Sequence, residues 1–290
     1  MLGTSSRGAD TLLVQIPDNL PGLLWHYTNA AGLSGILTSG ALRFSNAQSV
    51  NDETEYRHGR TIVIEQIERE IAKADSLSSV FASVMQHILE RRTLEELFIC
   101  CLSETGDSRY HWRSYGDFGY GYGIGITPHD LLSAGEFTAV WPRPLVYRPT
   151  EQRAAVARAL DRFRRRTMYI GDPSAGLDHL VLELFRLTLV FKNPKYFRES
   201  EWRLILVAPL SYPPLRQRIK TTDRAYAVNS YVDLRAQATD CSRLPIKQIV
   251  CGSNLDSTSS RSQVEQLLAM HGYTDVAVSA SEIAPIEITA

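Results

Sequence analysis

Residues 23–45 read LLWHYTNAAGLSGILTSGALRFS, and this stretch alone contains both kinds of regular secondary structure. Its first six residues, LLWHYT, are apolar and aromatic, which predicts a strand. Asn29 is a suitable N-cap for a short helix that ends at Gly40, and residues 41–45 then predict a second strand. The chain therefore begins with a strand–helix–strand unit whose His-Tyr-Thr and Arg-Phe-Ser segments could be neighbours.

Two pairs of helices are predicted farther along, because apolar residues recur there at steps of three and four. These helices cover residues 52–72, 76–97, 150–168 and 173–191. Further strands are predicted at 97–102, 123–126, 202–207, 246–251 and 275–279, with a helix around 264–270. This irregular order predicts a single α+β domain over 21–290 with helical insertions near 52–97 and 150–191, preceded by a flexible arm at 1–20.

Composition limits the classes of function. The chain has 290 residues, is 44% hydrophobic, and carries 31 basic and 32 acidic residues for a net charge of −1. That balance argues against a protein whose whole surface binds nucleic acid or an acidic membrane. No apolar run approaches the ~20 residues that span a bilayer, and no secretory signal is evident. The four cysteines show no metal-binding spacing, so we expect buried thiols in a cytoplasmic protein without metal.

The end of the first predicted strand places an imidazole, a phenol and a hydroxyl in succession at His26, Tyr27 and Thr28. A lone histidine in an apolar strand is often a core residue. The three polar groups together also suit one wall of a binding site.

Residues 112–116, Trp-Arg-Ser-Tyr-Gly, concentrate rings and a cation in a predicted loop. Core packing favours Leu or Val, whereas Trp112 and Tyr115 can stack a planar ligand while Arg113 holds an anion. This segment predicts a pocket wall.

Asp52, Glu55 and His58 have a spacing that suits a metal or acid–base cluster. The same spacing suits a capping box, in which Asp52 caps the helix and Glu55 closes the box. Both interpretations remain open from the sequence.

Glu201 and Arg203 open a strongly apolar strand. They form either a surface ion pair of small energetic value or a catalytic carboxylate held at a rigid strand end. A basic run on the third long helix suits a solvated face or a docking site for an acidic partner. Its members are Arg153, Arg158, Arg162, Arg164, Arg165 and Arg166.

Several of these segments, in this order, resemble a bacterial family known as domain of unknown function 2971. The matching motifs are Leu24–Thr28, Gly32–Leu37, Leu42–Asn46, Asn51–Glu55, Cys101–Ser103, Trp112–Gly116 and Lys192–Arg203. The last has the pattern Lys-x-x-x-Tyr-x-x-Glu-x-Glu-Trp-Arg.

A more distant resemblance is to ADP-ribosyltransferases, because a histidine on a first strand, a serine on a middle strand and a glutamate opening a later strand occur in the same order. The resemblance implies split mixed sheets around an NAD site. By position, His26 would contact the NAD ribose, Ser103 would support the site, Tyr115 would flank nicotinamide and Glu201 would bond a ribose hydroxyl. The remaining cofactor-binding residues would be Tyr27, Thr28, Arg43, Ser45, Trp112 and Arg113.

This resemblance predicts an enzyme that transfers ADP-ribose from NAD to an unknown protein or nucleic acid, as in bacterial toxins and defence factors. Breaking the nicotinamide–ribose bond develops oxocarbenium character, which a nearby carboxylate stabilises. Two alternatives are a non-catalytic nucleotide-binding or interaction module of the same fold, and a metal-dependent hydrolase or nuclease that uses His26, Asp52, Glu55 and His58.

Overall fold

The computed structural model describes residues 17–47, 53–90, 95–209, 217–224, 227–236 and 243–287. The strands are β1 (Leu24–Thr28), β2 (Ala41–Asn46), β3 (Glu95–Ser103), β4 (Tyr122–Ile126), β5 (Val140–Pro144), β6 (Glu201–Pro209), β7 (Lys220–Arg224), β8 (Ala227–Arg235), β9 (Ile246–Cys251) and β10 (Ala277–Ala280). The α-helices are α1 (Ala30–Ser39), α2 (Glu53–Ile71), α3 (Ser78–Leu89), α4 (Arg109–Ser114), α5 (Pro128–Leu132), α6 (Pro149–Ile170), α7 (Leu177–Val190) and α9 (Ser257–Met270). Three 3-10 helices, η1 (Asp117–Gly119), η2 (Gly135–Ala139) and η3 (Pro194–Glu199), complete the described elements.

The strands form one mixed, open sheet, so the predicted α+β class is confirmed. Its main order is β10-β9-β4-β1-β3-β2-β8-β7. β6 lies off this path and pairs with β3, and β5 pairs with the free edge of β6. β9 and β10 are parallel, whereas the other ladders are antiparallel.

The central strand β3 has an unusual set of neighbours. β6 pairs with β3 along the whole length of β3. β1 and β2 both pair with the opposite edge of β3, at different positions along the strand. β1 meets β3 at Ser103, and β2 meets it at Phe98 and Ile99. The sheet therefore splits over residues 100–102 of β3, and the His-Tyr-Thr and Arg-Phe-Ser segments lie on the two arms of the split without pairing with each other.

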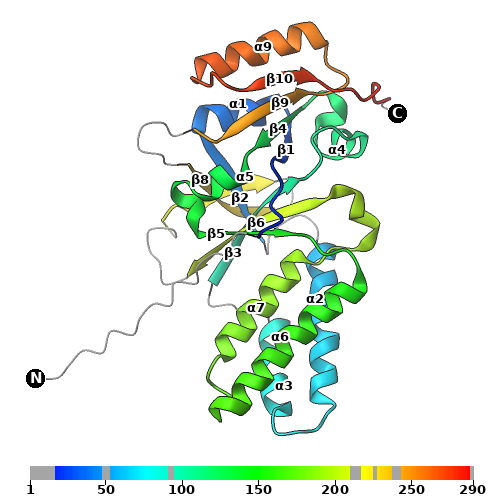
Figure 1. Cartoon of the computed structure of the whole chain (residues 1–290), viewed down its shortest axis with the longest axis vertical. Coiled ribbons are helices and arrows are strands. Elements are labelled where there is room, and N and C mark those ends of the chain that lie inside the picture. The colour runs from blue at the N-terminus through cyan, green and yellow to red at the C-terminus, as the bar shows by residue number, and fades with distance from the viewer. Residues whose placement is uncertain are drawn as a thin grey trace, which may run out of the picture.

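The two predicted helix pairs are present as α2–α3 and α6–α7, and they pack together as a bundle at one end of the sheet (Figure 1). Ile99 and Ile205 contribute to the core beneath the bundle, together with Phe81, Phe163 and Leu184. A second core on the other sheet face lies beneath α1 and α9. Its residues include Leu24, Phe44, Leu102, Ile124, Trp202 and Leu268.

The local signals at the first helix are confirmed. Asn29 Oδ1 accepts from the Gly32 N–H at 2.9 Å, which satisfies one of the free amide groups at the helix N-terminus. Gly40 ends the helix with φ 59°, a left-handed conformation that a residue without Cβ adopts readily.

Two predicted helix boundaries were wrong. α3 ends at Leu89, eight residues before the predicted end, because β3 takes residues 95–103 into its ladder with β6. α7 begins at Leu177 and not at Pro173, because Asp172 Oδ1 accepts from the Ser174 backbone N–H at 2.9 Å and closes a local turn.

Candidate functional site

One face of the β3–β6 ladder changes from apolar to charged along its length. Residues directly opposite in an antiparallel ladder share a face, and so do residues two apart along a strand. Along this face the opposed pairs are Ile99 with Ile205, Cys101 with Arg203, and Ser103 with Glu201. The polar pairs lie where β3 ends and β6 begins, next to the helix bundle.

Four buried ionisable residues meet at this polar end, and we call Lys192, Glu199, Glu201 and Arg203 the charged cluster. Lys192 Nζ donates to Glu201 Oε2 at 2.6 Å and also to Glu199 Oε2. Arg203 Nε donates to Glu201 Oε1 at 2.7 Å. Two cations therefore face two carboxylates, and both oxygens of Glu201 are engaged.

The two carboxylates of the charged cluster have opposite pKa shifts. Burial alone would raise the pKa of Glu201, but the charges of Arg203 and Lys192 outweigh it and lower the pKa to about 2. Burial raises the pKa of Glu199, and the contact with Lys192 only partly offsets this effect. Glu201 is therefore ionised at neutral pH, whereas Glu199 is the easier of the two to protonate.

Glu199 also attaches α4 to the sheet. Tyr110 and Tyr115 donate their hydroxyls to Glu199 Oε1 at 3.0 and 3.1 Å. The Glu199 carbonyl accepts from Ser103 Oγ at 2.9 Å and from His111 Nε2 at 3.1 Å. The structure thus brings the predicted residues Ser103, Tyr115 and Glu201 into or beside one cluster.

His26 lies across β3 from the charged cluster, at the split of the sheet. Its Nδ1 is 3.5 Å from the backbone oxygen of Cys101, in the segment of β3 that β1 and β2 leave unpaired on that edge of the described sheet. Desolvation lowers the pKa of His26, so the imidazole is neutral near pH 7. Glu201 lies on the β6 side of β3, so the structure does not place these two predicted residues on one wall.

Tyr27 and Thr28 have clear packing partners. Tyr27 donates its hydroxyl to the Thr105 carbonyl at 2.8 Å and stacks on His111 with ring centroids 4.8 Å apart. Thr28 lies so close to Gly32 that a Cβ there would be 1.8 Å from the Thr28 Oγ1. Both side chains therefore contribute to joining β1 to its neighbours.

Arg43 and Ser45 lie on β2, on the other arm of the split. Arg43 is exposed, forms an ion pair with Asp233 at 3.3 Å and stacks 3.8 Å above the ring of Tyr231. Ser45 is half-buried opposite Ile99. These two predicted residues are on the β2–β8 side of the sheet.

The aromatic segment 112–116 divides between the core and the surface. Trp112 is fully buried, and its Nε1–H donates to Asp107 Oδ1 at 2.6 Å. Arg113 is exposed, and Tyr115 keeps 49% of its surface accessible. The predicted pocket wall therefore has two parts, of which only the second is available to a ligand from solvent.

Of the three residues Asp52, Glu55 and His58, the structure describes the side chain of His58 only. Asp52 lies outside the described residues, as does the side chain of Glu55 within α2. His58 Nε2 is 3.2 Å from Gln152 Oε1. Within the described part of the chain, no group of three or more His, Cys, Asp or Glu side chains could hold a metal ion.

Some arginines of α6 form ion pairs within the bundle. Arg164 contacts Glu70 at 2.6 Å and also Asp75, Arg165 contacts Asp161 at 2.9 Å, and Arg162 contacts Glu183. Half of the predicted basic run is therefore matched by the protein's own acids, which leaves Arg153, Arg158 and Arg166 for any acidic partner.

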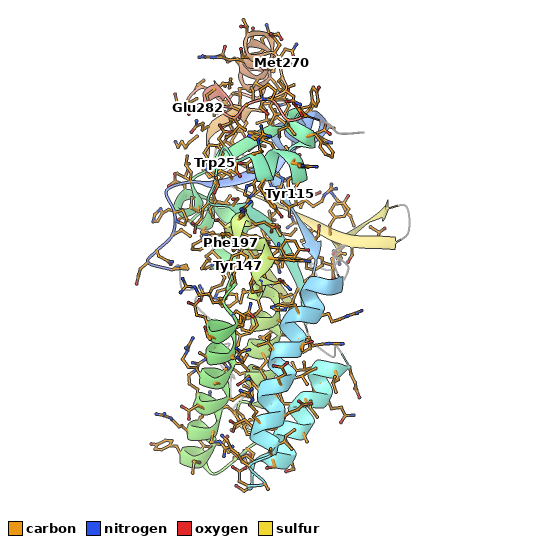
Figure 2. All side chains as sticks on the ribbon, turned by 90° about the vertical axis from the view of Figure 1, so that its right-hand side faces the viewer. Trp25, Tyr115, Tyr147, Phe197, Met270 and Glu282 are labelled. Atoms are coloured by element: carbon orange, nitrogen blue, oxygen red, sulfur yellow. The ribbon has the colours of Figure 1, made fainter. Side chains whose placement is uncertain are left out.

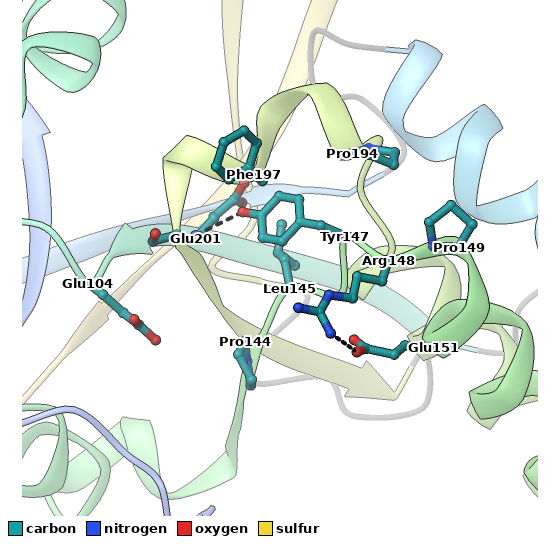
Figure 3. A pocket seen from close by; sticks show the side chains of 11 residues that line it. Glu104, Pro144, Leu145, Tyr147, Arg148, Pro149, Glu151, Pro194, Phe197 and Glu201 are labelled. Atoms are coloured by element: carbon teal, nitrogen blue, oxygen red, sulfur yellow. Dashed lines mark hydrogen bonds and ion pairs between the residues drawn. The ribbon is translucent and has the colours of Figure 1, made fainter.

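A cleft of about 560 Å³ opens between η3 and the junction of β5 with α6 (Figure 3). It is lined by Glu104, Pro144, Leu145, Tyr147, Arg148, Pro149, Glu151, Pro194, Phe197, Ser200 and Glu201. Tyr147 Oη accepts from the Glu201 backbone N–H at 3.0 Å, and Arg148 pairs with Glu151 at 3.3 Å. The cleft has the volume of a small-molecule site and combines rings, a cation and carboxylates.

The sequence did not single out Lys192, Glu199, Arg203 or Tyr147 as site residues. The signal for the first three was present in the Lys192–Arg203 motif, where a lysine precedes two glutamates and an arginine at fixed spacing. Tyr147 belongs to a separate segment, and only the turn from β5 into α6 brings it to Glu201.

Comparison with protein families, curated proteins and solved structures finds no match to this chain. Among the described residues, none of the helices is both long and apolar enough to cross a bilayer.

Proposed function

We propose that the cleft binds NAD or a related nucleotide and that the protein is an ADP-ribosyltransferase-like enzyme. The observation that carries the proposal is the position of Glu201, paired with Lys192 and Arg203, among the residues that line a cleft of about 560 Å³. A fixed carboxylate stabilises the positive charge that develops on the ribose when the bond to nicotinamide breaks.

The other lining residues suit the remaining parts of a dinucleotide. The rings of Tyr147 and Phe197 offer apolar surface for a planar base, and Phe197 is 60% exposed. Arg148 lies beside the first turn of α6, where the helix dipole also favours negative charge. We therefore assign Arg148 to the pyrophosphate, and we assign His26 no contact with a ligand in this cleft.

The test is release of nicotinamide from NAD by the purified protein, with binding followed by thermal stabilisation. Glu201→Gln is expected to abolish release, while Glu151→Gln, a second lining carboxylate, retains it. Glu201→Gln leaves the buried Arg203 without its carboxylate, and Lys192 keeps only Glu199. Arg148→Ala therefore provides a variant with little effect on folding. It should weaken NAD binding, whereas Arg158→Ala on the exposed face of α6 should not. Absence of NAD binding by the wild-type protein would refute the proposal.

A second candidate is a nucleotide-binding module without catalysis. The observation in its favour is that Lys192 and Arg203 engage both oxygens of Glu201, so that neither oxygen is free for a ribose hydroxyl. This alternative predicts that NAD raises the melting temperature while no nicotinamide is released.

A further inference from the structure

A second surface, beside the cleft, carries exposed rings and unneutralised cations. α4 and η3 are in contact, and Tyr115 from the end of α4 donates to Glu199 at the end of η3. Figure 2 shows Tyr115, Phe197 and Tyr147 one below another on the same side of the molecule. Because Phe197 also lines the cleft, this surface is continuous with it.

Four large rings on α4, on η3 and on the adjoining η1 are exposed to solvent. Tyr115, Phe118, Tyr120 and Phe197 keep 49%, 44%, 47% and 60% of their surface accessible. Phe118 and the preceding Asp117 both have left-handed backbones, with φ near 52° and 51°. Such conformations cost about 1–3 kcal/mol each for residues other than glycine, so the fold maintains an unfavourable turn at the segment that presents Phe118.

Four cations occur among these rings in the sequence of the two segments. Arg109, Arg113, Lys195 and Arg198 are all exposed, and none of them forms an ion pair with a carboxylate of the described residues. Arg109 instead donates to the backbone oxygens of Ala284 and Pro285. We call these four rings and four cations the aromatic–basic surface.

The acids on the same segments do not cancel this charge. Between residues 109 and 120 the sequence has a single acid, Asp117, and between 194 and 199 it has only Glu199. Glu199 is buried, and its carboxylate accepts hydrogen bonds from Lys192, Tyr110 and Tyr115. These two segments therefore carry four exposed cations against one exposed acid, Asp117, on a chain whose net charge is −1.

We infer that the aromatic–basic surface binds single-stranded nucleic acid and, on the proposed function, presents it to the cleft as the acceptor. Exposed ring faces stack unpaired bases of any sequence, and interleaved cations contact the phosphates between them. A duplex keeps its bases stacked on each other, so the rings discriminate in favour of single strands. An acidic protein would use the cations but has no need of the rings.

The test measures fluorescence anisotropy of labelled single-stranded DNA and RNA of about 16 nucleotides, with a duplex and polyglutamate for comparison. The two single strands are expected to bind more tightly than either competitor, and their ratio identifies the natural acceptor. Phe118→Ala should weaken single-strand binding by about tenfold. Arg113→Ala and Arg198→Ala should each reduce the salt slope by about one.

Matched controls lie at the far end of α6. Tyr169 is 93% exposed and Arg165 is paired only with Asp161, so Tyr169→Ala and Arg165→Ala should leave binding unchanged. Equal affinity for duplex, tighter binding of polyglutamate, or equal loss in these controls would overturn the inference.

The binding assay contains no NAD, so it is independent of the proposed reaction. Phe118→Ala should release nicotinamide at the wild-type rate while losing oligonucleotide affinity. Oligonucleotide binding without any NAD binding would refute the proposed function alone, whereas nicotinamide release without oligonucleotide binding would refute the acceptor surface alone.

Discussion

The middle and one end of the β3–β6 ladder use the same strands and the same sheet face in opposite ways. In the middle, Ile99 and Ile205 pack against the helix bundle as ordinary core residues. At the end where β6 begins, Glu201 and Arg203 are equally buried but charged, with Lys192 inserted from the segment after α7. Burial alone therefore does not distinguish a structural region from a candidate site in this protein.

The difference lies in what each region loses when one group is removed. An apolar contact is lost in proportion to the atoms deleted, whereas a buried ion left without its partner keeps its full desolvation penalty. The ion pairs of the charged end therefore fix the Glu201 carboxylate in one arrangement.

Lys192→Met should have the largest effect, because it leaves Glu199 and Glu201 without their shared cation. Breaking a buried ion pair in this way costs about 3–5 kcal/mol of unfolding free energy, measurable by urea denaturation at neutral pH. Lys195→Met, three residues away and exposed, should change stability by less than about 0.5 kcal/mol. A Lys192→Met protein as stable as wild type would show that the charged cluster is not energetically coupled.

Acid should weaken the charged end selectively. The pKa of Glu201 is about 2 in the folded protein against an ordinary 4.5, so its stabilisation is present above pH 4.5 and lost as the pH falls toward 2. The loss amounts to about 3 kcal/mol from Glu201, and the raised pKa of Glu199 acts in the opposite sense. Unfolding curves from pH 6 to pH 3 should be flatter for Glu201→Gln than for wild type, and unchanged in slope for Glu265→Gln.

Ile205→Val tests the apolar middle of the ladder. Removing one buried methylene should cost about 1 kcal/mol, with the same value at every pH, because the substitution adds and removes no ionisable group. A pH-dependent cost would show that this apolar region is coupled to Glu201, which would contradict the contrast drawn between the two regions.

Arg165→Ala should have the smallest effect. Its pair with Asp161 spans one helical turn in solvent at 2.9 Å, so its loss should change stability by less than about 0.5 kcal/mol. A melting temperature several degrees lower would mean that surface pairs on α6 matter as much as the buried ones on β6.

Local signals predicted much of the fold. The cap at Asn29, the stop at Gly40 and the strand at Ile246–Cys251 depend on neighbours within a few residues, and all three are confirmed. β7 and β8 were not predicted, because β8 depends on pairing with β2, nearly two hundred residues earlier in the chain, and β7 in turn pairs with β8.

The candidate site was predicted less completely, for a related reason. Glu201 stood out because it opens an apolar strand, but the burial of its carboxylate required Lys192 and Arg203 to converge on it. Trp112 shows the reverse case, since its ring suits either a pocket or a core and only Asp107 and Tyr27 decide for the core. The residue type limits the roles that a side chain can have, and the residues that contact it determine which of these roles it has.

The ladder between β3 and β6 also has a consequence for how the chain folds. It joins residues about 100 positions apart, with α4, α5, α6 and α7 between them. The entropy cost of closing a long loop is incurred before such contacts stabilise the chain, so we expect this ladder to form late and to limit the refolding rate. The helices of the bundle can form from local contacts alone, and the Glu201 carboxylate of β6 stays hydrated until β6 pairs with β3.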